Sequence, residues 1–487
     1  MPASPDDATR SFALDRRQFL AAGAGVVVAR RLSAAPRPEG GTDVLVIGAG
    51  LSGLNAALLL EEQGLRVTVL EGRKRVGGRM FTLDEIPGRP EGGGSLLGPR
   101  YARALDLVGR FKVRLAPARP RTEPVRGEVM LNVRGQNILL EDWARSPLNR
   151  QPERLRALAP WEVYFQELPG LNPMRNLGDW RDPAFAASDL PMQQVLERAG
   201  YEPEAIQLMQ SNSSYGNDFY TLSALHLFHY FTWQKLQQVE GPRVSCADGN
   251  QRLPEAMARA LRGEVLLDSP VAALRSTPTG VEATCANGRR FKARFALCTL
   301  PAPVLRTLKL DPPLLGEQAD AVLNLGYHKT FQVHFAFKRR FWDSDGLPPS
   351  MWTDSPVGRF NALKDADGKE IVCFLAYANG HNAARLDRLP PDEAAQLVLA
   401  ELAAMRPSTR GALEVLRVWS MQNDRYAGGS YATWAPGQAE RFTRGLIQPW
   451  GRVHFAGEHT ALLSRGFEGA LESGERAALE LLERAEG

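Results

Sequence analysis

The clearest hydrophobic pattern in the chain is a short apolar run that is followed by glycines and by a longer apolar segment. Residues 43–47 (DVLVI) are mostly apolar and rich in β-branched side chains, which predicts a buried parallel strand. Residues 48–53 (GAGLSG) follow at once, residues 54–63 predict a helix, and residues 66–70 predict a second strand that ends at Glu71. This order of strand, glycine loop, helix and strand predicts an α/β domain with a parallel sheet.

The glycine loop has the spacing G-x-G-x-x-G that binds dinucleotides. Gly48 permits a tight turn, Gly50 lets a pyrophosphate approach the backbone, and Gly53 lets the helix pack closely on the strand. The helix that begins near Ser52 offers its first N–H groups and its positive dipole end to the phosphates. Glu71 can accept hydrogen bonds from ribose hydroxyls, whereas it would repel a 2′-phosphate. We therefore expect a dinucleotide cofactor other than NADP.

Two further glycine-rich segments follow, at residues 71–79 (EGRKRVGGR) and 92–99 (GGGSLLGP). Glycines between arginines again indicate a backbone that closely approaches an anion, and Arg79 can neutralise a pyrophosphate. The patterns R-x-G-G-R and G-G-S-x-x-G-P resemble the flavin-dependent amine oxidases, a family that includes monoamine oxidases, polyamine oxidases and L-amino-acid oxidases. The resemblance implies FAD as cofactor, bound in this region by Arg73, Gly78, Arg79, Gly94, Ser95 and Gly98.

Two later segments extend the resemblance, which covers the chain from about residue 42 to its end. It implies that the backbone of Val271 holds the adenine. Near the C-terminus, residues 452–460 (RVHFAGEHT) and 468–476 (EGALESGER) are similar to the family's flavin-binding strand, loop and last helix. The N-terminus of that helix is expected to face the flavin or a phosphate. The flavin contacts implied here are Gly457, Glu458, Gly469 and Ala470.

The same resemblance implies two discontinuous domains, a Rossmann-like FAD-binding domain and an α+β substrate domain. The FAD-binding domain is expected at residues 42–112, 242–320 and 416–487, and the substrate domain at residues 113–241 and 321–415. Residues 113–241 contain no further glycine fingerprint. They do contain many aromatic residues, most of which we expect in the core rather than in the site.

Three residues are expected to take part in catalysis. The family oxidises an amine C–N bond to an imine by moving a hydride to flavin N5, and the imine is then hydrolysed. By resemblance, Lys329 holds a water against N5, while its neighbour His328 faces the other way because strand residues alternate. Tyr431 stands on the flavin face, where its ring guides the amine, and Phe467 forms the opposite wall. The chemistry requires no metal ion and no nucleophilic triad.

Four departures from the family pattern bear on the site. Monoamine oxidases have a flavin-linked cysteine at the position of Ser430, so FAD is expected to be non-covalent. The segment of residues 466–469, which contains Phe467, is one residue shorter than in those enzymes, and the family's tryptophan falls on Met421. L-amino-acid oxidases bind the substrate carboxylate with an arginine at the position of Phe81, which favours amines without an α-carboxylate unless Arg100 supplies the charge.

These departures leave alternatives open. The first is an L-amino-acid oxidase that yields a 2-oxo acid. The second is an enzyme similar to carotenoid desaturases or protoporphyrinogen oxidase, which share the opening motifs. A flavoprotein that has lost activity and only binds a partner is disfavoured because the motifs are complete.

The first 40 residues are interpreted as an export signal and a linker. Arg16 and Arg17 precede residues 18–20 (QFL), and residues 19–29 form an apolar run of small side chains, a pattern that resembles a twin-arginine signal. The run is too short to span a bilayer, which requires about 20 residues in a helix. We therefore expect a periplasmic or secreted enzyme without a transmembrane helix, with oxygen or a periplasmic electron carrier as acceptor.

Composition removes several other classes. The chain of 487 residues is 44% hydrophobic and 23% charged, as in ordinary globular proteins, and its formal net charge of +4 does not indicate nucleic-acid binding. The cysteines lie far apart, at positions 246, 285, 298 and 373, which excludes a disulfide-dense scaffold and disfavours a structural zinc site. The expected partner is a small-molecule amine, and the expected assembly is a monomer or a homodimer.

Overall fold

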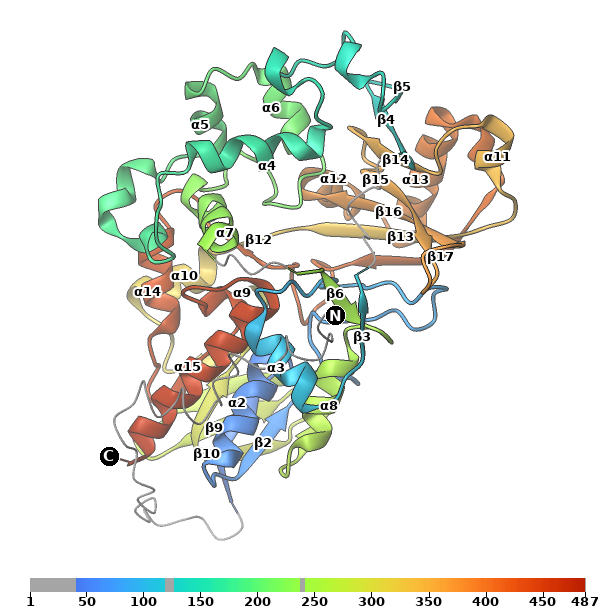
Figure 1. The fold of residues 1–487 in the computed structure, drawn as a ribbon. Coiled ribbons are helices and arrows are strands. Elements are labelled where there is room, and N and C mark those ends of the chain that lie inside the picture. The colour runs from blue at the N-terminus through green and yellow to red at the C-terminus, as the bar shows by residue number, and fades with distance from the viewer. Residues whose placement is uncertain (1–40, 119–126, 237–240, 487) are drawn as a thin grey trace, which may run out of the picture.

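The computed structural model describes residues 41–118, 127–236 and 241–486. The expected export signal at residues 1–40 lies outside the described residues. In the described part the chain forms two large units, each built on its own sheet, which lie one above the other in Figure 1. No helix in this part is both long enough and apolar enough to cross a membrane.

The lower unit in Figure 1 is built on a largely parallel sheet with β1 (Thr42–Ile47) near its centre. β1 pairs in parallel with β2 (Val67–Leu70) on one side and with β10 (Arg290–Cys298) on the other, and β10 also pairs in parallel with β19 (Val453–Phe455). The run of apolar residues in β1 is explained by this position, since a central parallel strand is covered on both faces. The remaining strands of the sheet are β7 (Val265–Leu266), β8 (Val271–Ser276), β9 (Val281–Cys285) and β11 (Lys309–Asp311).

Two helices from opposite ends of the chain cover this sheet side by side (Figure 1). α2 (Leu51–Glu62) follows the glycine loop directly, and α15 (Gly466–Glu486) packs along it. A Cβ built on Gly53 would lie 2.0 Å from the carbonyl oxygen of Gly48, so only glycine permits the turn between β1 and α2. The other helices of this unit are α3 (Ala102–Arg110), α8 (Arg252–Ala260), α9 (Ala302–Leu305), α10 (Gly316–Asn324) and α14 (Ala439–Ile447).

The upper unit is built on a second sheet, which is mainly antiparallel and has the strand order β17-β13-β16-β15-β14-β4-β5. Its strands are β4 (Val129–Val133), β5 (Gln136–Leu139), β13 (Thr330–Phe337), β14 (Ser350–Thr353), β15 (Arg359–Lys364), β16 (Ile371–Asn379) and β17 (Leu413–Ser420). Its helices are α4 (Pro160–Leu171), α5 (Met192–Arg198), α6 (Pro203–Gln210), α7 (Ala224–Leu236), α11 (Phe341–Asp345), α12 (Gly380–Leu386) and α13 (Pro391–Met405).

Two short ribbons join segments that are distant in the sequence. β3 (Leu115–Pro117) pairs with β6 (Val244–Cys246), and β12 (Gly326–Tyr327) pairs with β18 (Ala432–Thr433). The second ribbon matters for the site because it sets the start of β13 against the loop that carries Tyr431.

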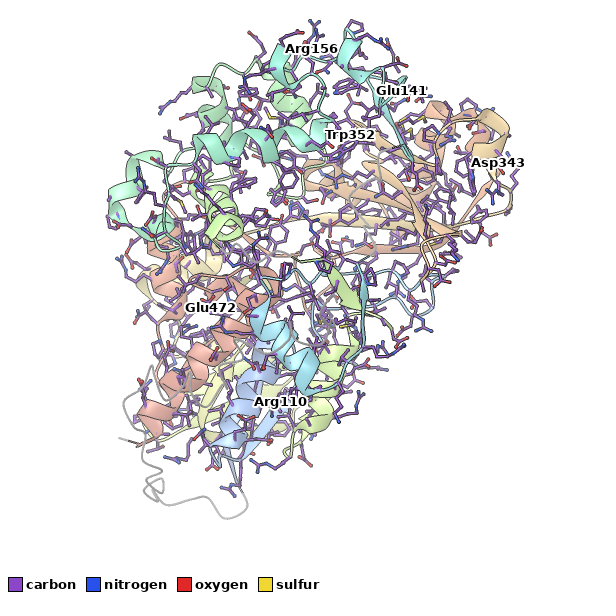
Figure 2. The ribbon with its side chains drawn as sticks, viewed as in Figure 1. Arg110, Glu141, Arg156, Asp343, Trp352 and Glu472 are labelled. Carbon is purple, nitrogen blue, oxygen red and sulfur yellow. The ribbon has the colours of Figure 1, made fainter. Side chains whose placement is uncertain are left out.

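Burial follows the expected division between core and surface. Trp352 lies inside the upper unit with none of its surface exposed, whereas Glu141 and Asp343 lie at the outer edge (Figure 2). Most of the aromatic residues of positions 113–241 belong to this core, among them Trp143, Tyr164 and Trp180. The expected fold class, a Rossmann-like α/β unit with a discontinuous α+β unit, is confirmed. The expected domain boundary at residue 416 falls inside β17, a strand of the upper sheet.

Candidate active site

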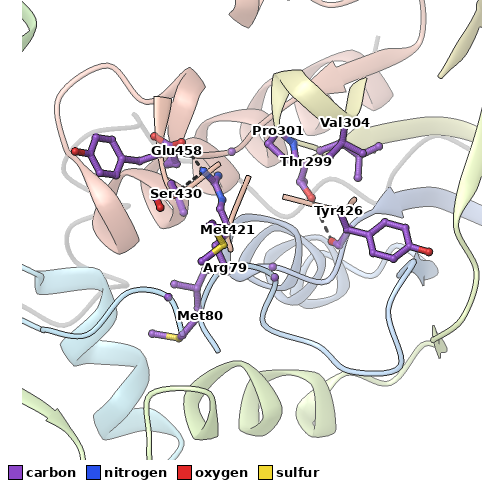
Figure 3. Close-up of a pocket in the computed structure, with 18 of the residues that line it drawn as sticks. Arg79, Met80, Thr299, Pro301, Val304, Met421, Tyr426, Ser430 and Glu458 are labelled. Atoms are coloured by element: carbon purple, nitrogen blue, oxygen red, sulfur yellow. Dashed lines mark hydrogen bonds and ion pairs between the residues drawn. The ribbon is translucent and has the colours of Figure 1, made fainter. Parts of the chain in front are cut away.

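A cavity of about 810 Å³ runs along the carboxyl ends of β1 and β2 and extends to the upper sheet. This volume is at the upper end of the range of about 300–1,000 Å³ for small-molecule and cofactor sites. Its position at the carboxyl ends of parallel strands is where open α/β sheets bind ligands. Figure 3 shows one region of it, with Arg79, Met421 and Ser430 on one side and Thr299 and Tyr426 on the other.

Most of the residues predicted to bind FAD lie in the wall of this one cavity, although they come from six separate segments. Those that line it are Gly48, Gly50, Ser52, Glu71, Arg73, Gly78, Arg79, Gly94, Ser95, Val271, Gly457, Glu458 and Ala470. Gly53, Gly98 and Gly469 do not line it. Gly53 and Gly469 are packing positions, where a Cβ would lie 2.0 and 2.8 Å from a backbone oxygen, and Gly98 lines a smaller neighbouring cavity.

The N-terminus of α2 opens onto the cavity at Gly50. This residue is the N-cap and contributes no side-chain cap, so the first N–H groups of the helix have no side-chain acceptor. A Cβ built on Gly50 would meet nothing within 4 Å, because the space beside it belongs to the cavity. Glu71 lies nearby and accepts hydrogen bonds from the N–H groups of Ala49 and Arg73, both at 2.8 Å. These contacts hold its carboxylate at the end of β2.

Arg79 connects three motifs in the cavity wall (Figure 3). Its Nη1 donates to Glu458 Oε1 at 2.8 Å and to the carbonyl oxygen of Ser430 at 3.1 Å. Burial alone would lower the pKa of Arg79, but the Glu458 carboxylate more than offsets this effect and raises it. Glu458 also accepts from the N–H of Ala432 at 2.9 Å, so it fixes the loop that carries Tyr431 as well.

Tyr431 lines the cavity, and both its ring and its hydroxyl are held in place. His328 stacks on the ring with a centroid distance of 4.8 Å. The hydroxyl donates to the carbonyl oxygen of Ser214 and accepts from the N–H of Gly216 at 3.3 Å. Burial raises the pKa of Tyr431, so the phenol stays neutral. The ring is therefore a fixed, uncharged aromatic wall.

Phe467 also lines the cavity. It packs so closely against the glycine-rich segment that a Cβ on Gly94 would lie 2.2 Å from its ring. Tyr101 contacts it edge-on, with ring centroids 6.2 Å apart. Further tyrosines that line the cavity are Tyr215, Tyr230 and Tyr377, which the sequence did not single out as site residues.

The structure places Lys329 outside the cavity lining, contrary to the expectation. Its charge acts on the carboxyl of Asp387, just beyond α12, while the N–H of Lys329 donates to Asn217 at 2.8 Å. The residues of this strand that reach the cavity are Thr330 and Gln332. The expected place of Lys329 at the site was therefore wrong. His328, which was expected to face away, also lies outside the lining and stacks on Tyr431.

Gln332 takes the place in the cavity wall that the sequence had assigned to Lys329. It is 1% exposed, its Nε2 donates to the carbonyl oxygen of Gly92 at 3.2 Å, and its Oε1 contacts His334 Nε2 at 3.1 Å. The lining contains no lysine among the described residues. The polar groups that β13 presents to the site are thus the hydroxyl of Thr330 and the amide of Gln332.

The other departures have clear positions. Met421 lines the cavity, whereas Trp419 packs against Phe81 with tilted rings and donates to the carbonyl oxygen of Gly92 at 2.9 Å. Phe81 itself does not line the cavity, so its identity does not decide whether the site accepts a carboxylate. Arg100 lines the smaller neighbouring cavity. The described residues contain no cluster of histidine, cysteine or acidic side chains suited to a metal ion.

Residues 51–482 match the family of flavin containing amine oxidoreductases. The chain belongs to this family. It is an FAD-dependent amine oxidoreductase, as the motifs predicted. Among curated proteins it is 27% identical to an L-amino-acid oxidase of Mus musculus, over 93% of this chain and 72% of that protein. It is 26% identical to flavin-containing amine oxidase B of Homo sapiens, over 90% of this chain and 86% of that protein.

Solved structures of other flavoenzymes share the fold of this amine oxidoreductase. Putrescine oxidase bound to putrescine superposes with a TM-score of 0.72 at 22% identity, covering 91% of this chain and 99% of that one. Cyclohexylamine oxidase from Brevibacterium oxydans IH-35A gives the same TM-score and identity over 92% of this chain and 100% of that one. These similarities confirm the fold class.

Proposed function

We propose that this amine oxidoreductase binds FAD non-covalently and oxidises the C–N bond of a small amine to an imine, which water then hydrolyses to a carbonyl compound and ammonia or an amine. The observation that carries the proposal is the single cavity in which the FAD-binding motifs and the aromatic wall of Tyr431 and Phe467 meet.

The cavity wall fits FAD in shape and in polarity. The uncapped N-terminus of α2 at Gly50 provides N–H groups and a positive dipole end for a pyrophosphate. Glu71, held by two backbone N–H groups, provides an acceptor for ribose hydroxyls. Val271 lies farther along the same wall, where the resemblance places the adenine. These residues are the ones that would hold the cofactor.

Non-covalent binding is supported by the cysteine positions. The four cysteines are buried and free, and none of them lines the cavity. Ser430 occupies the position of the flavin-linked cysteine of monoamine oxidases, and its hydroxyl contacts Thr330 Oγ1 at 2.8 Å. A serine cannot form a thioether, so no group of that kind is available for attachment.

The protein's own contribution is to position a neutral amine and to exclude water. When bound, FAD supplies the acceptor for the hydride that leaves the carbon beside the amine nitrogen. Tyr431 and Phe467 provide an aromatic enclosure for the amine. The amine can bind against the faces of these two rings and lose its proton there. Gln332, fixed by Gly92 and His334, provides a polar group that can orient a water or the amine.

The electron acceptor and the cellular location belong to the same proposal. Arg16, Arg17 and the apolar residues that follow support export by the twin-arginine route and therefore a periplasmic or secreted enzyme. Oxygen or a periplasmic electron carrier would then reoxidise the cofactor.

The test is reduction of the bound flavin by amines in the absence of oxygen. The holoenzyme is mixed with primary and secondary amines, and loss of the visible flavin absorbance is followed in a stopped-flow instrument. Bleaching that saturates with amine concentration, with formation of the matching aldehyde or ketone, supports the function. A flavin that stays oxidised with every amine, while dithionite still reduces it, contradicts the function.

A further inference from the structure

Arg465 is a half-buried cation in the wall of the cavity, and no carboxylate of the described residues forms an ion pair with it. It lies in the turn just before α15 and lines the cavity together with Tyr431 and Phe467. No carboxylate oxygen of the described residues lies within 4.0 Å of its nitrogens, and its Nη2 is buried without a hydrogen-bond acceptor. Burial lowers the pKa of Arg465 to about 10, which leaves it fully protonated at neutral pH.

The surroundings of Arg465 hold its guanidinium in one place. The Nε donates to His229 Nδ1 at 2.8 Å, which requires that this ring nitrogen carry no proton. Burial keeps the pKa of His229 well below its ordinary value, so the imidazole is neutral and can accept. The guanidinium carbon lies 4.8 Å from the ring centre of Trp180 and 5.1 Å from that of Trp434. Two indoles and one imidazole thus orient the cation, and the carboxylates of Glu458 and Glu472 act to raise its pKa without forming an ion pair with it.

The acidic groups of the cavity are already engaged. Glu71 and Glu458 are the only carboxylates among the described residues of its lining. Glu71 accepts from two backbone N–H groups, and Glu458 pairs with Arg79 at 2.8 Å. A second ammonium group on a substrate would therefore find no unpaired carboxylate here, whereas a negative group would find the unpartnered Nη2 of Arg465.

The smaller cavity beside the first has the same electrostatic character. Tyr101, Ser214, Tyr215 and Tyr230 line both cavities, so the two share a wall. The smaller one is also lined by Arg100, Arg243 and Arg359, and by no acidic residue of the described part. Cationic side chains along such a wall attract anions.

We propose that Arg465 binds a carboxylate group of the substrate, and that this enzyme prefers amines that also carry a carboxylate. The guanidinium is planar and presents paired N–H groups that match a carboxylate in a two-point contact. A carboxylate would provide the hydrogen-bond acceptor that Nη2 lacks and a direct ion pair. This inference rests on the proposed amine oxidation and replaces the expectation, drawn from Phe81, that the substrate has no carboxylate.

The first experiment compares amines in matched pairs. Phenethylamine is paired with L-phenylalanine, which carries a carboxylate on the carbon beside the amine. Hexylamine is paired with 6-aminohexanoate, which carries a carboxylate at the far end of the chain. The two pairs therefore distinguish an adjacent carboxylate from a distant one. We expect one carboxylate-bearing member to reduce the flavin at least about ten-fold faster than its partner at low concentration. Faster reduction by the plain amine in both pairs overturns the inference and leaves the proposed function intact.

The second experiment changes the arginine. Arg465→Gln should remove the preference for the carboxylate, mainly through a higher KM, and Arg465→Lys should restore part of it. Arg181→Gln is the matched control, because Arg181 is also partly buried beside Trp180 but does not line the cavity. An unchanged preference in Arg465→Gln, or an equal loss in the control, contradicts the assignment.

The third experiment does not depend on turnover. Benzoate is titrated calorimetrically into the holoenzyme and into the Arg465→Lys and Arg465→Gln proteins. Binding that weakens about ten-fold or more without Arg465 supports the carboxylate site even if none of the four amines is oxidised. Absent binding, or equal affinity in all three proteins, overturns it. If Arg465→Gln purifies without FAD, the lysine variant decides: unchanged benzoate affinity there contradicts a two-point contact.

Discussion

Arg79 and Glu458, which are 379 residues apart in the sequence, form an ion pair of 2.8 Å in the wall of the cavity. The side chains are 21% and 9% exposed, so the pair is largely removed from solvent. Through it, the glycine-rich segment after β2 is joined to the residues after β19 and to the loop of Tyr431. The pair therefore fixes three parts of the site relative to one another.

Removal of the Glu458 carboxylate should lower the stability of the folded protein. Glu458→Ala leaves the Arg79 cation without its partner, and breaking a buried pair in this way costs about 3 kcal/mol or more. Glu458→Gln should cost less, because its amide oxygen can still accept from Arg79 and from the N–H of Ala432. Thermal or denaturant unfolding of the FAD-loaded proteins measures both. Asp343→Asn, in the exposed pair with Arg340, is the control and should change stability by less than about 1 kcal/mol.

The ring of Tyr431 should matter more than its hydroxyl. Tyr431→Leu removes the aromatic wall, and loss of a contact between a ring and a cationic amine of about 0.5–2 kcal/mol lowers kcat/KM by about 2- to 30-fold. Tyr431→Phe keeps the ring and loses only the bonds to Ser214 and Gly216. Steady-state kinetics should therefore rank Phe above Leu. A Phe variant as slow as the Leu variant would assign the role to the hydroxyl instead.

Substitution of Lys329 should leave catalysis nearly unchanged, because its side chain is outside the cavity lining. We expect Lys329→Met to reduce its flavin with amine within about two-fold of the unmodified enzyme. Gln332→Leu should slow reduction by about a hundred-fold, the low end for loss of one positioned polar group. Both rates are measured by stopped-flow under saturating amine. A slow Lys329→Met with a normal FAD content would restore the original assignment.

The flavin should leave the protein on denaturation. Ser430 replaces the linking cysteine, and no described cysteine lines the cavity, so acid or heat should release FAD into the supernatant. Absorbance spectra and chromatography of the supernatant and of the precipitated chain provide the measurement. Flavin that stays with the precipitate after washing would contradict non-covalent binding.

Stability should fall as the pH drops below about 6.5. Burial lowers the pKa of His328 and His459 to about 4, while an unfolded chain protonates its histidines near 6.5. Between these values the unfolded state binds more protons than the folded state, so each histidine destabilises the fold by about 1 kcal/mol per pH unit. Denaturant unfolding at pH 7, 6 and 5 tests this, and His328→Gln should flatten the profile. A flat profile for the unmodified protein would refute it.

The cofactor-binding half of the site could be predicted from the sequence because local backbone geometry requires glycine at its key positions. Gly53 is required by the nearby carbonyl of Gly48, and Gly48 itself has a φ of +105° that other residues rarely adopt. Such requirements for glycine recur at fixed spacing, so a sequence motif is enough to detect them. The apolar run of β1 and its parallel partners follow from the same local pattern.

The substrate-binding half could not be predicted to the same degree. The face that β13 turns to the cavity depends on where the strand begins, and an error of one residue exchanges Lys329 for its neighbours. The orientation of Arg465 in the cavity depends on His229 and Trp180. These two residues are distant from Arg465 in the sequence and contact it only in the folded protein. Tyr215 and Tyr230 were expected in the core, because nothing in the sequence indicates that the two side chains line a cavity.

The packing of α2 against α15 has a consequence for synthesis on the ribosome. Asn55 Nδ2 donates to the carbonyl oxygen of Leu471 at 3.0 Å, and a Cβ on Gly474 would lie 2.3 Å from the carbonyl oxygen of Ser52. A nascent chain that has just emerged as far as β19 already contains the glycine loop but lacks the helix that covers it. Tight loading of FAD must therefore wait until α15 has left the exit tunnel, and a truncated product that ends before Gly466 should emerge colourless.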